Sequence, residues 1–445
     1  MAIQRYIKTF AKSSPVRFLL VTFTIFCLYS VNSYSDFKSG DWRRLVGAGD
    51  VVPNTYLSWN LLRYKTFSFD ESVQHLRRFE NWNNDPSYFV KIGGHYFSAY
   101  PSLVGLAPLP VFFIAYSLGK ISHIGDLYNL LKVAYLARIS ASILTALSVV
   151  VFFRILSMIS SSRVWVVLFS LFYALGTNSW SISSRGLWQH TLSQLLISVI
   201  AYLLISKFDK KKVVPWLGFL LGASVFARPT NIIFAVVISA YVFLEQRKLF
   251  AKFFLCSLIW VFAMFIYNYF IFGSPFSEGY GVRDDFRWTT PLEVGIVGYL
   301  FSPARSFLFV SPPLVLAFIS MYRLFKDKKY QKDRNLILRY LSIGFILSTL
   351  MFAKWYTWNG ANGFGYRMLT DYLPIVTLLS FLVFIRLNRI LKTAVFVLIL
   401  YSIYIQANAV FFHYSRCGGD HDWDYYCLHP PKEKISEVLK NVSNK

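Results

Sequence analysis

Charged residues are scarce in this chain, and acidic ones are the scarcest, with 22 Asp and Glu against 46 Lys and Arg. Only 15% of the residues are charged, whereas a water-soluble domain carries about a quarter. Long apolar runs take the place of the missing charges, which excludes a soluble globular protein. The net charge of +24 does not indicate nucleic acid as a partner, because Lys and Arg gather in short loops between the runs, as in membrane proteins.

Cysteine is also rare, with four residues in the whole chain. Cys27 and Cys256 lie inside apolar runs, so we expect them to be packing residues. Cys417 and Cys427 flank a polar segment near the end of the sequence. Their spacing suits a disulfide if this segment lies in an oxidising compartment. A metal site formed by His421 and the nearby aspartates is the alternative for the same segment.

Apolar runs as long as a bilayer is thick dominate the sequence. A helix of about 20 apolar residues spans the hydrocarbon core, because it satisfies its own backbone hydrogen bonds there. The first run has no small-residue cleavage pattern and is predicted to be an anchor. We predict an all-α polytopic membrane protein with about eleven membrane-spanning helices, near 16–34, 135–157, 164–182, 190–206, 213–228, 230–245, 251–272, 305–325, 337–354, 372–387 and 392–412.

The run at 101–118 is ambiguous. If it crossed the membrane, five later basic loops would lie outside, against the positive-inside rule. We therefore predict a re-entrant or juxtamembrane helix there, interrupted by Pro108 and Pro110. The N-terminus is then cytoplasmic, whereas a large first loop, 35–100, and a tail, 414–445, are extracytoplasmic. Residues 1–413 form one transmembrane domain in this prediction.

The complicated loops all fall on the extracytoplasmic face, which favours binding and chemistry there. Asp50 lies in the first loop, before an amphipathic stretch, 54–64, that we expect at the membrane surface. A carboxylate in this position suits a general base. Its local sequence alone favours the alternative, a helix cap or a solvated acid.

Cations border the apolar runs on the same face. An ionisable group at membrane depth is costly and usually has a partner or a role, and arginine suits a phosphate because its planar fork donates two hydrogen bonds. Each one alone can equally extend to lipid headgroups. Together they indicate an anionic lipid substrate, and they are Arg185, His190, Arg228, Arg305 and Arg367.

Aromatic residues surround a glycine-rich stretch, residues 358–367. An interfacial aromatic belt explains them simply. The alternative is a sugar-binding platform around Trp358, in which rings pack on the sugar, Asn amides bond its hydroxyls and the glycines let the backbone approach closely.

The order of the motifs resembles the GT-C superfamily of membrane glycosyltransferases, close to the protein O-mannosyltransferase and aminoarabinose transferase group. The resemblance covers most of the chain. The motifs that carry it are Gly49-Asp50 with 56–62, Gly94-His-Tyr-Phe-Ser-Ala-Tyr-Pro101, Ser184-Arg-Gly-Leu-Trp-Gln-His190, Ala227-Arg-Pro-Thr230, 267–275, Phe301-Ser-Pro-Ala-Arg305 and 358–367 before Leu373-Pro374.

The resemblance implies transfer of a sugar from a polyprenyl-phosphate donor to an acceptor hydroxyl, with inversion. Asp50 matches the catalytic aspartate, and the cations named above, together with His95, Tyr100 and Trp358, would bind the donor. Val51 and Ala99 stand where the family often has an acidic and a basic residue. A divalent cation stays open as a cofactor, although no ligand spacing indicates one.

Two other hypotheses remain. An O-antigen polymerase or ligase is also polytopic with basic external loops, and its functional residues would be arginines in later loops. A lipid or polysaccharide transporter commonly shows internal repeats and helices broken at mid-membrane. The sequence has no internal repeat that we find, and its polar residues gather at one face, which argues against transport. The acceptor and the identity of the sugar are not encoded in any motif.

Overall fold

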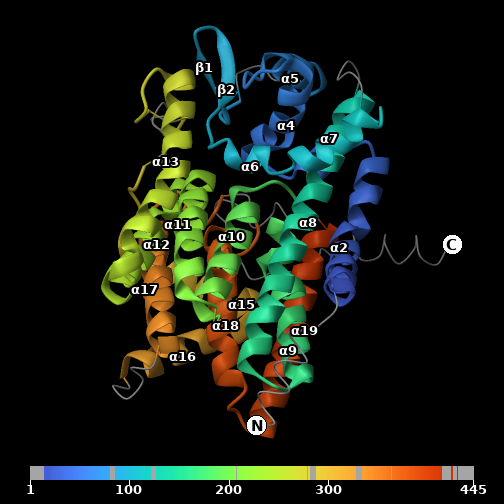
Figure 1. The fold of residues 1–445 in the computed structure, drawn as a ribbon. Coiled ribbons are helices and arrows are strands. Elements are labelled where there is room, and N and C mark those ends of the chain that lie inside the picture. The colour runs from blue at the N-terminus through green and yellow to red at the C-terminus, as the bar shows by residue number, and fades with distance from the viewer. Residues whose placement is uncertain are drawn as a thin grey trace, which may run out of the picture.

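The computed structural model describes residues 15–80, 86–121, 127–206, 208–277, 279–280, 287–326, 333–361, 363–412, 422–423 and 428. Within these ranges a bundle of long helices carries a smaller layer over one end (Figure 1). We call this layer, residues 39–121, the cap, and the end that it covers the capped end. The predicted disulfide partners Cys417 and Cys427, and His421, lie outside the described residues.

Each of the eleven predicted runs contains a helix. The helices of the bundle are α2 (Pro15–Lys38), α8 (Leu127–Ile159), α9 (Arg163–Leu175), α10 (Gln189–Ile205), α11 (Lys210–Ala227), α12 (Ile232–Glu245), α13 (Phe250–Phe272), α16 (Leu316–Lys326), α17 (Asp333–Ala353), α18 (Leu373–Phe384) and α19 (Arg389–Phe412). Five stretches in the described part are long and apolar enough to cross a membrane: Tyr128–Ile159, Arg247–Phe272, Arg334–Ala353, Arg367–Phe384 and Arg389–Phe412. The chain is therefore a helical membrane protein, as predicted.

The run at 305–325 is not one helix. It contains α15 (Phe307–Val310), the 3₁₀ turn η5 (Pro312–Val315) and α16, and it follows the short helix α14 (Leu292–Phe301). Pro312 and Pro313 have no backbone N–H to donate, so the helix cannot continue through them. The chain bends at this point, and Arg305 and Ser311 turn into the protein interior.

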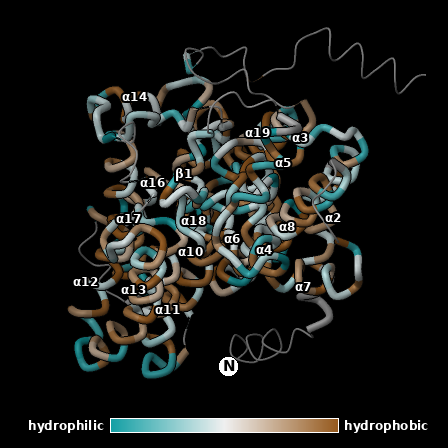
Figure 2. Tube along the Cα trace, turned by 90° about the horizontal axis from the view of Figure 1, so that it is seen from above, coloured by the Kyte–Doolittle hydropathy of each residue, from teal (hydrophilic) through white to brown (hydrophobic). Residues whose placement is uncertain are grey.

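The interior of the bundle is formed by α10 and α18, which lie among the other helices when the molecule is seen from above (Figure 2). Almost all of α18 is buried, whereas α13 is exposed along nearly its whole length. An apolar helix with this exposure suits contact with lipid. Gly218 and Gly222 let α11 pack directly on the backbone of α13 at Phe253 and Ser257, the close approach that small residues allow between membrane helices.

The cap consists of short elements that pack on one another. They are α3 (Trp42–Val46), the 3₁₀ turn η1 (Gly49–Val51), α4 (Val52–Tyr64), α5 (Asp70–Glu80), β1 (Phe89–Ile92), β2 (His95–Ser98), α6 (Leu103–Leu106) and α7 (Leu109–Ser117). β1 and β2 form an antiparallel hairpin in which Phe89 pairs with Ser98. Gly93 and Gly94 both have positive φ, as a two-residue hairpin turn with this backbone requires.

α4 is more deeply buried than the sequence suggests. Residues 52–60 are all buried within the protein, whereas we predicted an amphipathic stretch, 54–64, at the membrane surface. Ser58 Oγ donates to the carbonyl oxygen of Gly105 at 2.5 Å, and a Cβ on Gly105 would collide with Leu57. α4 therefore packs against α6 across a glycine, beneath the rest of the cap.

The ambiguous run at 101–118 belongs to the cap. Its two short helices, α6 and α7, are separated at Pro108, and both pack against α4. Neither is long enough to cross a bilayer, because nine residues of helix rise only about 14 Å. The break at Pro108 matches the interruption that the sequence predicts, and the juxtamembrane position of this segment stays a prediction.

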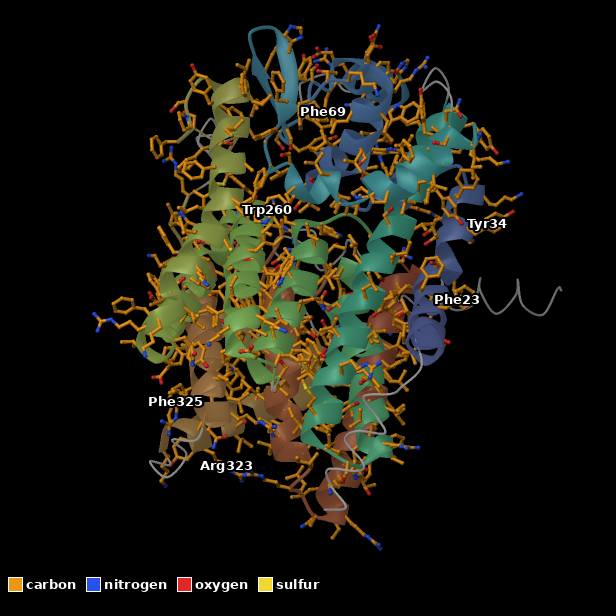
Figure 3. All side chains as sticks on the ribbon, viewed as in Figure 1. Phe23, Tyr34, Phe69, Trp260, Arg323 and Phe325 are labelled. Carbon is orange, nitrogen blue, oxygen red and sulfur yellow. The ribbon has the colours of Figure 1, made fainter. Side chains whose placement is uncertain are left out.

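Basic residues lie at the end of the bundle opposite the cap. Arg323 lies at that end, far from Phe69 in the cap (Figure 3). The turns after α8, α10, α12 and α18 fall at the same end, because consecutive helices of the bundle alternate in direction (Figure 1). The positive-inside rule predicts that this end faces the cytoplasm and that the cap faces outward.

Cysteine labelling tests this orientation. In a chain without its native cysteines, we expect Lys91→Cys, exposed on β1, to react with a membrane-impermeant maleimide on intact cells. Lys248→Cys, exposed in the turn after α12, should react only after the membrane is permeabilised. The reverse pattern would contradict the predicted orientation, and labelling of both from outside would contradict the helix arrangement.

Candidate functional site

The candidate site lies where the ends of several helices meet at the capped end. Asp50 lies in η1, directly before α4, and His190 lies in the first turn of α10. Arg228 follows the last residue of α11. Arg367 begins η6 (Arg367–Tyr372), the 3₁₀ turn that leads into α18. Segments far apart in the sequence are thus brought to one place by the fold.

Asp50 and Arg367 form an ion pair, with 2.9 Å between Asp50 Oδ2 and Arg367 Nη1. No side chain caps α4 through a hydrogen bond, and its N-cap residue is Val51. The carboxylate is therefore directed to the arginine and not to the helix backbone. The guanidinium group also lies over the Trp188 ring, 4.6 Å from its centroid, which fixes its plane.

Arg228, His190 and Asp371 form a second, buried group beside this pair. Arg228 makes an ion pair with Asp371, and its Nη1 lies 3.0 Å from His190 Nδ1. Because arginine only donates, this hydrogen bond requires a neutral His190 with its proton on Nε2. The Asp371 carboxylate lies 3.3 Å from His190 Nδ1, but with the proton on Nε2 both atoms are acceptors, so Arg228 is the donor that links the acid and the histidine.

Trp188 lies between the two groups and contacts both of them. The Trp188 and His190 ring centroids are 6.3 Å apart, and Trp188 carries Arg367 on its face. Asn54 Nδ2 donates to the carbonyl oxygen of Leu187 at 2.9 Å, which ties the start of α4 to the segment before α10. The helices α4, α10 and α18 all begin here, and helix N-termini favour negative charge.

Three polar atoms of the η6 turn are buried without a hydrogen-bond partner among the residues that the structure describes. They are Arg367 Nε, Thr370 Oγ1 and Asp371 Oδ1. Buried polar atoms are nearly always paired, so the two donors among them, Arg367 Nε and Thr370 Oγ1, suit a ligand that accepts hydrogen bonds, whereas Asp371 Oδ1 is an acceptor. An anion with several oxygen atoms fits the Arg367 donor.

Arg185 lies in a different cluster. Its Nη2 is 3.3 Å from Asp36 Oδ2, and Arg138 Nη2 is 2.9 Å from the same oxygen. Arg138 also donates to the carbonyl oxygen of Arg44 at 2.6 Å. All three charged side chains are buried. Arg185 therefore joins α2, α8 and the segment before α10, and its carboxylate partner is not Asp50.

Arg305 and Trp358 are both buried in the structure. Arg305 Nε is 2.8 Å from Asp422 Oδ1, so this arginine already has a counter-charge. The Trp358 ring lies edge-on to Tyr299, 5.7 Å between centroids, and against Gly298. It packs inside the protein instead of presenting an open face.

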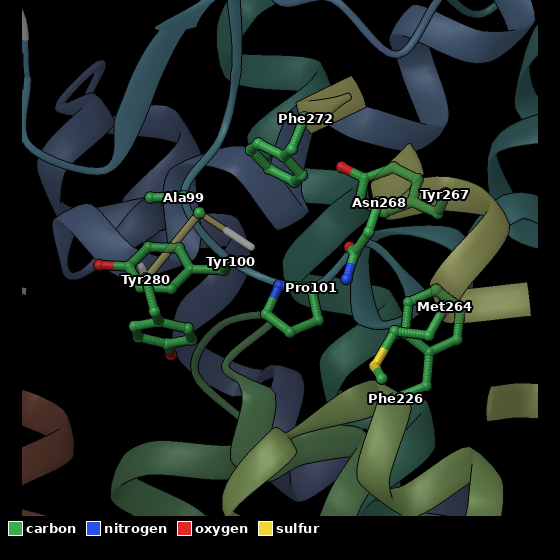
Figure 4. Close-up of a pocket in the computed structure, with 10 residues that line it drawn as sticks. Ala99, Tyr100, Pro101, Phe226, Met264, Tyr267, Asn268, Phe272 and Tyr280 are labelled. Atoms are coloured by element: carbon green, nitrogen blue, oxygen red, sulfur yellow. The ribbon is translucent and has the colours of Figure 1, made fainter. Parts of the chain in front are cut away.

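His95 and Tyr100 lie in two other pockets. His95 Nδ1 is 2.6 Å from Asp70 Oδ2, in a surface pocket of about 270 Å³. Partial burial raises the pKa of Asp70, but hydrogen bonds from Ser68, the Tyr96 amide and His95 outweigh it and leave the pKa below its usual range. Tyr100 lines a narrow pocket with Tyr280, their ring centroids 5.5 Å apart (Figure 4).

Sequence reasoning missed the acids that hold these arginines. Asp371, Asp36 and Asp422 each pair with a predicted cation. Asp371 stands directly before the apolar run of α18, and an ionisable residue in that position is a usable signal. No group of three or more His, Cys, Asp or Glu side chains in the described ranges is placed to hold a metal ion.

No protein-family model matches this chain, and no curated protein matches it. Among solved structures, it is similar to the crystal structure of ArnT from Cupriavidus metallidurans bound to undecaprenyl phosphate. The two are 11% identical with a TM-score of 0.48, over 85% of this chain and 61% of that chain. This chain thus spans about three fifths of the length of that protein. Similarity of this degree does not establish a shared activity.

The Asp36 cluster yields a stability prediction. Asp36→Asn would remove the carboxylate that the buried Arg138 and Arg185 share, and breaking a buried ion pair typically costs about 3–5 kcal/mol. We expect a clear fall in the melting temperature of the purified protein in detergent. Asp41→Asn is the matched control, because the Asp41–Arg44 pair is half-exposed and such pairs contribute about 0–1 kcal/mol. Equal melting temperatures for the two variants would contradict a structural role for Asp36.

Proposed function

We propose that this protein transfers a sugar from a polyprenyl-phosphate donor to an acceptor hydroxyl at the capped end of the bundle, on the extracytoplasmic side. The observation that carries the proposal is the Asp50–Arg367 ion pair beside the buried Arg228–Asp371 pair. It combines one accessible carboxylate with two guanidinium groups at the ends of membrane helices. A base and an anion site in one place are the parts that such a transfer needs.

The phosphate of the donor would bind to Arg367 and Arg228. Arg367 uses Nη1 for Asp50 and has Nε without a partner in the described part of the chain, so one edge of its fork is available to a phosphate oxygen. The polyprenyl chain is apolar and would lie along the exposed apolar side chains of α13. The narrow pocket of Figure 4, about 10 Å³, is too small to hold this chain as it stands.

Asp50 is the proposed general base. The acceptor oxygen attacks the anomeric carbon and gives its proton to Asp50, while the bond from that carbon to the phosphate oxygen breaks. The electron pair leaves with the polyprenyl phosphate, and Arg367 and Arg228 stabilise the negative charge that develops on it. A single displacement inverts the anomeric centre. Binding of the phosphate to Arg367 would compete with the Asp50–Arg367 contact and release the carboxylate for this step.

Substitution of Asp50 tests the proposal. We expect Asp50→Asn to fold and insert but to lose about 10²–10⁴-fold in transfer rate, the usual contribution of a general base. It should still bind undecaprenyl phosphate, whereas Arg367→Ala should bind it more weakly. The measurement is transfer of radiolabelled sugar from a polyprenyl-phosphate donor by purified protein in nanodiscs.

Asp41→Asn is the control, since Asp41 is an exposed carboxylate of the same loop that caps α3. Near-normal transfer by Asp50→Asn would remove Asp50 from the role of base. Extension of a lipid-linked glycan by that variant would instead favour a polymerase or ligase. Movement of the lipid across the bilayer without a new glycosidic bond would favour a transporter.

A further inference from the structure

Asp422 is bonded to two distant segments of the chain. It is buried, and its carboxylate oxygens accept hydrogen bonds from Arg305 Nε at 2.8 Å and from Asn359 Nδ2 at 2.7 Å. Its carbonyl oxygen accepts a further bond from Ser302 Oγ at 2.5 Å. A residue with an exposed side chain would make fewer bonds of this kind to other segments. The bonds indicate that Asp422 holds the segments that it touches.

The first of these segments leads to a glycine-rich loop. Arg305 is buried and donates to the carbonyl oxygens of Ala361, at 2.8 Å, and Gly363. Asn359 also accepts from the Ala361 amide at 3.0 Å. We call residues 359–361 and 363–366 the glycine loop. Asp422 thus neutralises the arginine that fixes the backbone of this loop, and it bonds the first residue of the loop directly.

The glycine loop in turn supports the side chain of Arg367. A Cβ on Gly363 would lie 2.7 Å from Arg367 Nε, and one on Gly360 would lie 3.2 Å from the same atom. The side chain of Arg367 therefore rests on the loop backbone. Its guanidinium group continues to Asp50, 2.9 Å away. If the loop moves, the Arg367 side chain that lies against it moves as well, and the ion pair between Arg367 and Asp50 is disturbed.

We propose that Asp422 is a positioning residue for the Asp50–Arg367 pair, acting through Arg305, Asn359 and the glycine loop. This inference rests on the proposed function for its effect on catalysis. Without the Asp422 carboxylate, Arg305 loses the counter-charge that the described residues give it, and a buried cation weakened in this way moves toward water or another acceptor. The loop carbonyls then lose their donor, and Arg367 loses its support.

Asp422→Asn tests the catalytic part, since it keeps the size of the side chain and removes its charge. We expect transfer of sugar from a polyprenyl-phosphate donor to fall about 10- to 100-fold, the effect of a misplacement of about 1 Å in an active site. Asp422→Glu should restore part of the rate. In an Arg367→Ala background, Asp422→Asn should cause no further loss, because both act through the same side chain. Trp423→Ala is the control, as Trp423 is exposed.

Hydrogen exchange tests the structural part without any need for activity. In the full chain in nanodiscs, Asp422→Asn should speed amide exchange in peptides that cover residues 355–368, and Trp423→Ala should not. If this occurs but the wild type transfers no sugar, the proposed function fails and the positioning role of Asp422 stands. Unchanged exchange in the loop, or faster exchange throughout the protein, would overturn the positioning role. So would a further loss in the Arg367→Ala background.

Discussion

A guanidinium group buried at the end of a membrane helix bundle needs a carboxylate beside it. Removal from water costs several kcal/mol for each ion, and only a close counter-charge with good hydrogen bonds offsets this. Five buried arginines meet this condition with four aspartates: Arg138 and Arg185 with Asp36, Arg228 with Asp371, Arg305 with Asp422, and Arg367 with Asp50. Each pair joins segments more than 90 residues apart, so the pairing of charges defines how the capped end is assembled.

The helices themselves follow from the sequence, because the thickness of a bilayer sets the length of an apolar run. The run predicted at 251–272 is α13, Phe250–Phe272, and that at 392–412 lies within α19. The prediction of a single helix fails for the run at 305–325, since hydropathy does not register a missing backbone donor. The segment 305–325 is broken at Pro312 for this reason. Which end of the bundle faces outward stays a prediction from the distribution of Lys and Arg.

The sequence identified the cations of the candidate site but not all of the acids that pair with them. Cations beside apolar runs are conspicuous, because an ionisable group there is costly, and Arg228 and Arg367 were found in this way. Asp371, the partner of Arg228, was not. Asp50 was singled out, but no local pattern records its contact with Arg367, which is 317 residues away. Local sequence even favoured a helix cap for Asp50, which the pairing with Arg367 replaces. Arg185 and Arg305 look like Arg367 in the sequence and differ from it through their partners alone.

Exposure also separates Asp50, the proposed base, from the other paired aspartates. The side chains of Asp371, Asp36 and Asp422 are 0%, 9% and 11% exposed, whereas that of Asp50 is 31% exposed. A buried carboxylate cannot take a proton without weakening the ion pair of an arginine that is itself buried. Asp50 has a single arginine partner, and that arginine has another face for an incoming anion. Among these four aspartates, Asp50 is therefore the most accessible and the one whose ion pair opens at the lowest cost, which supports the proposal that it acts as the base.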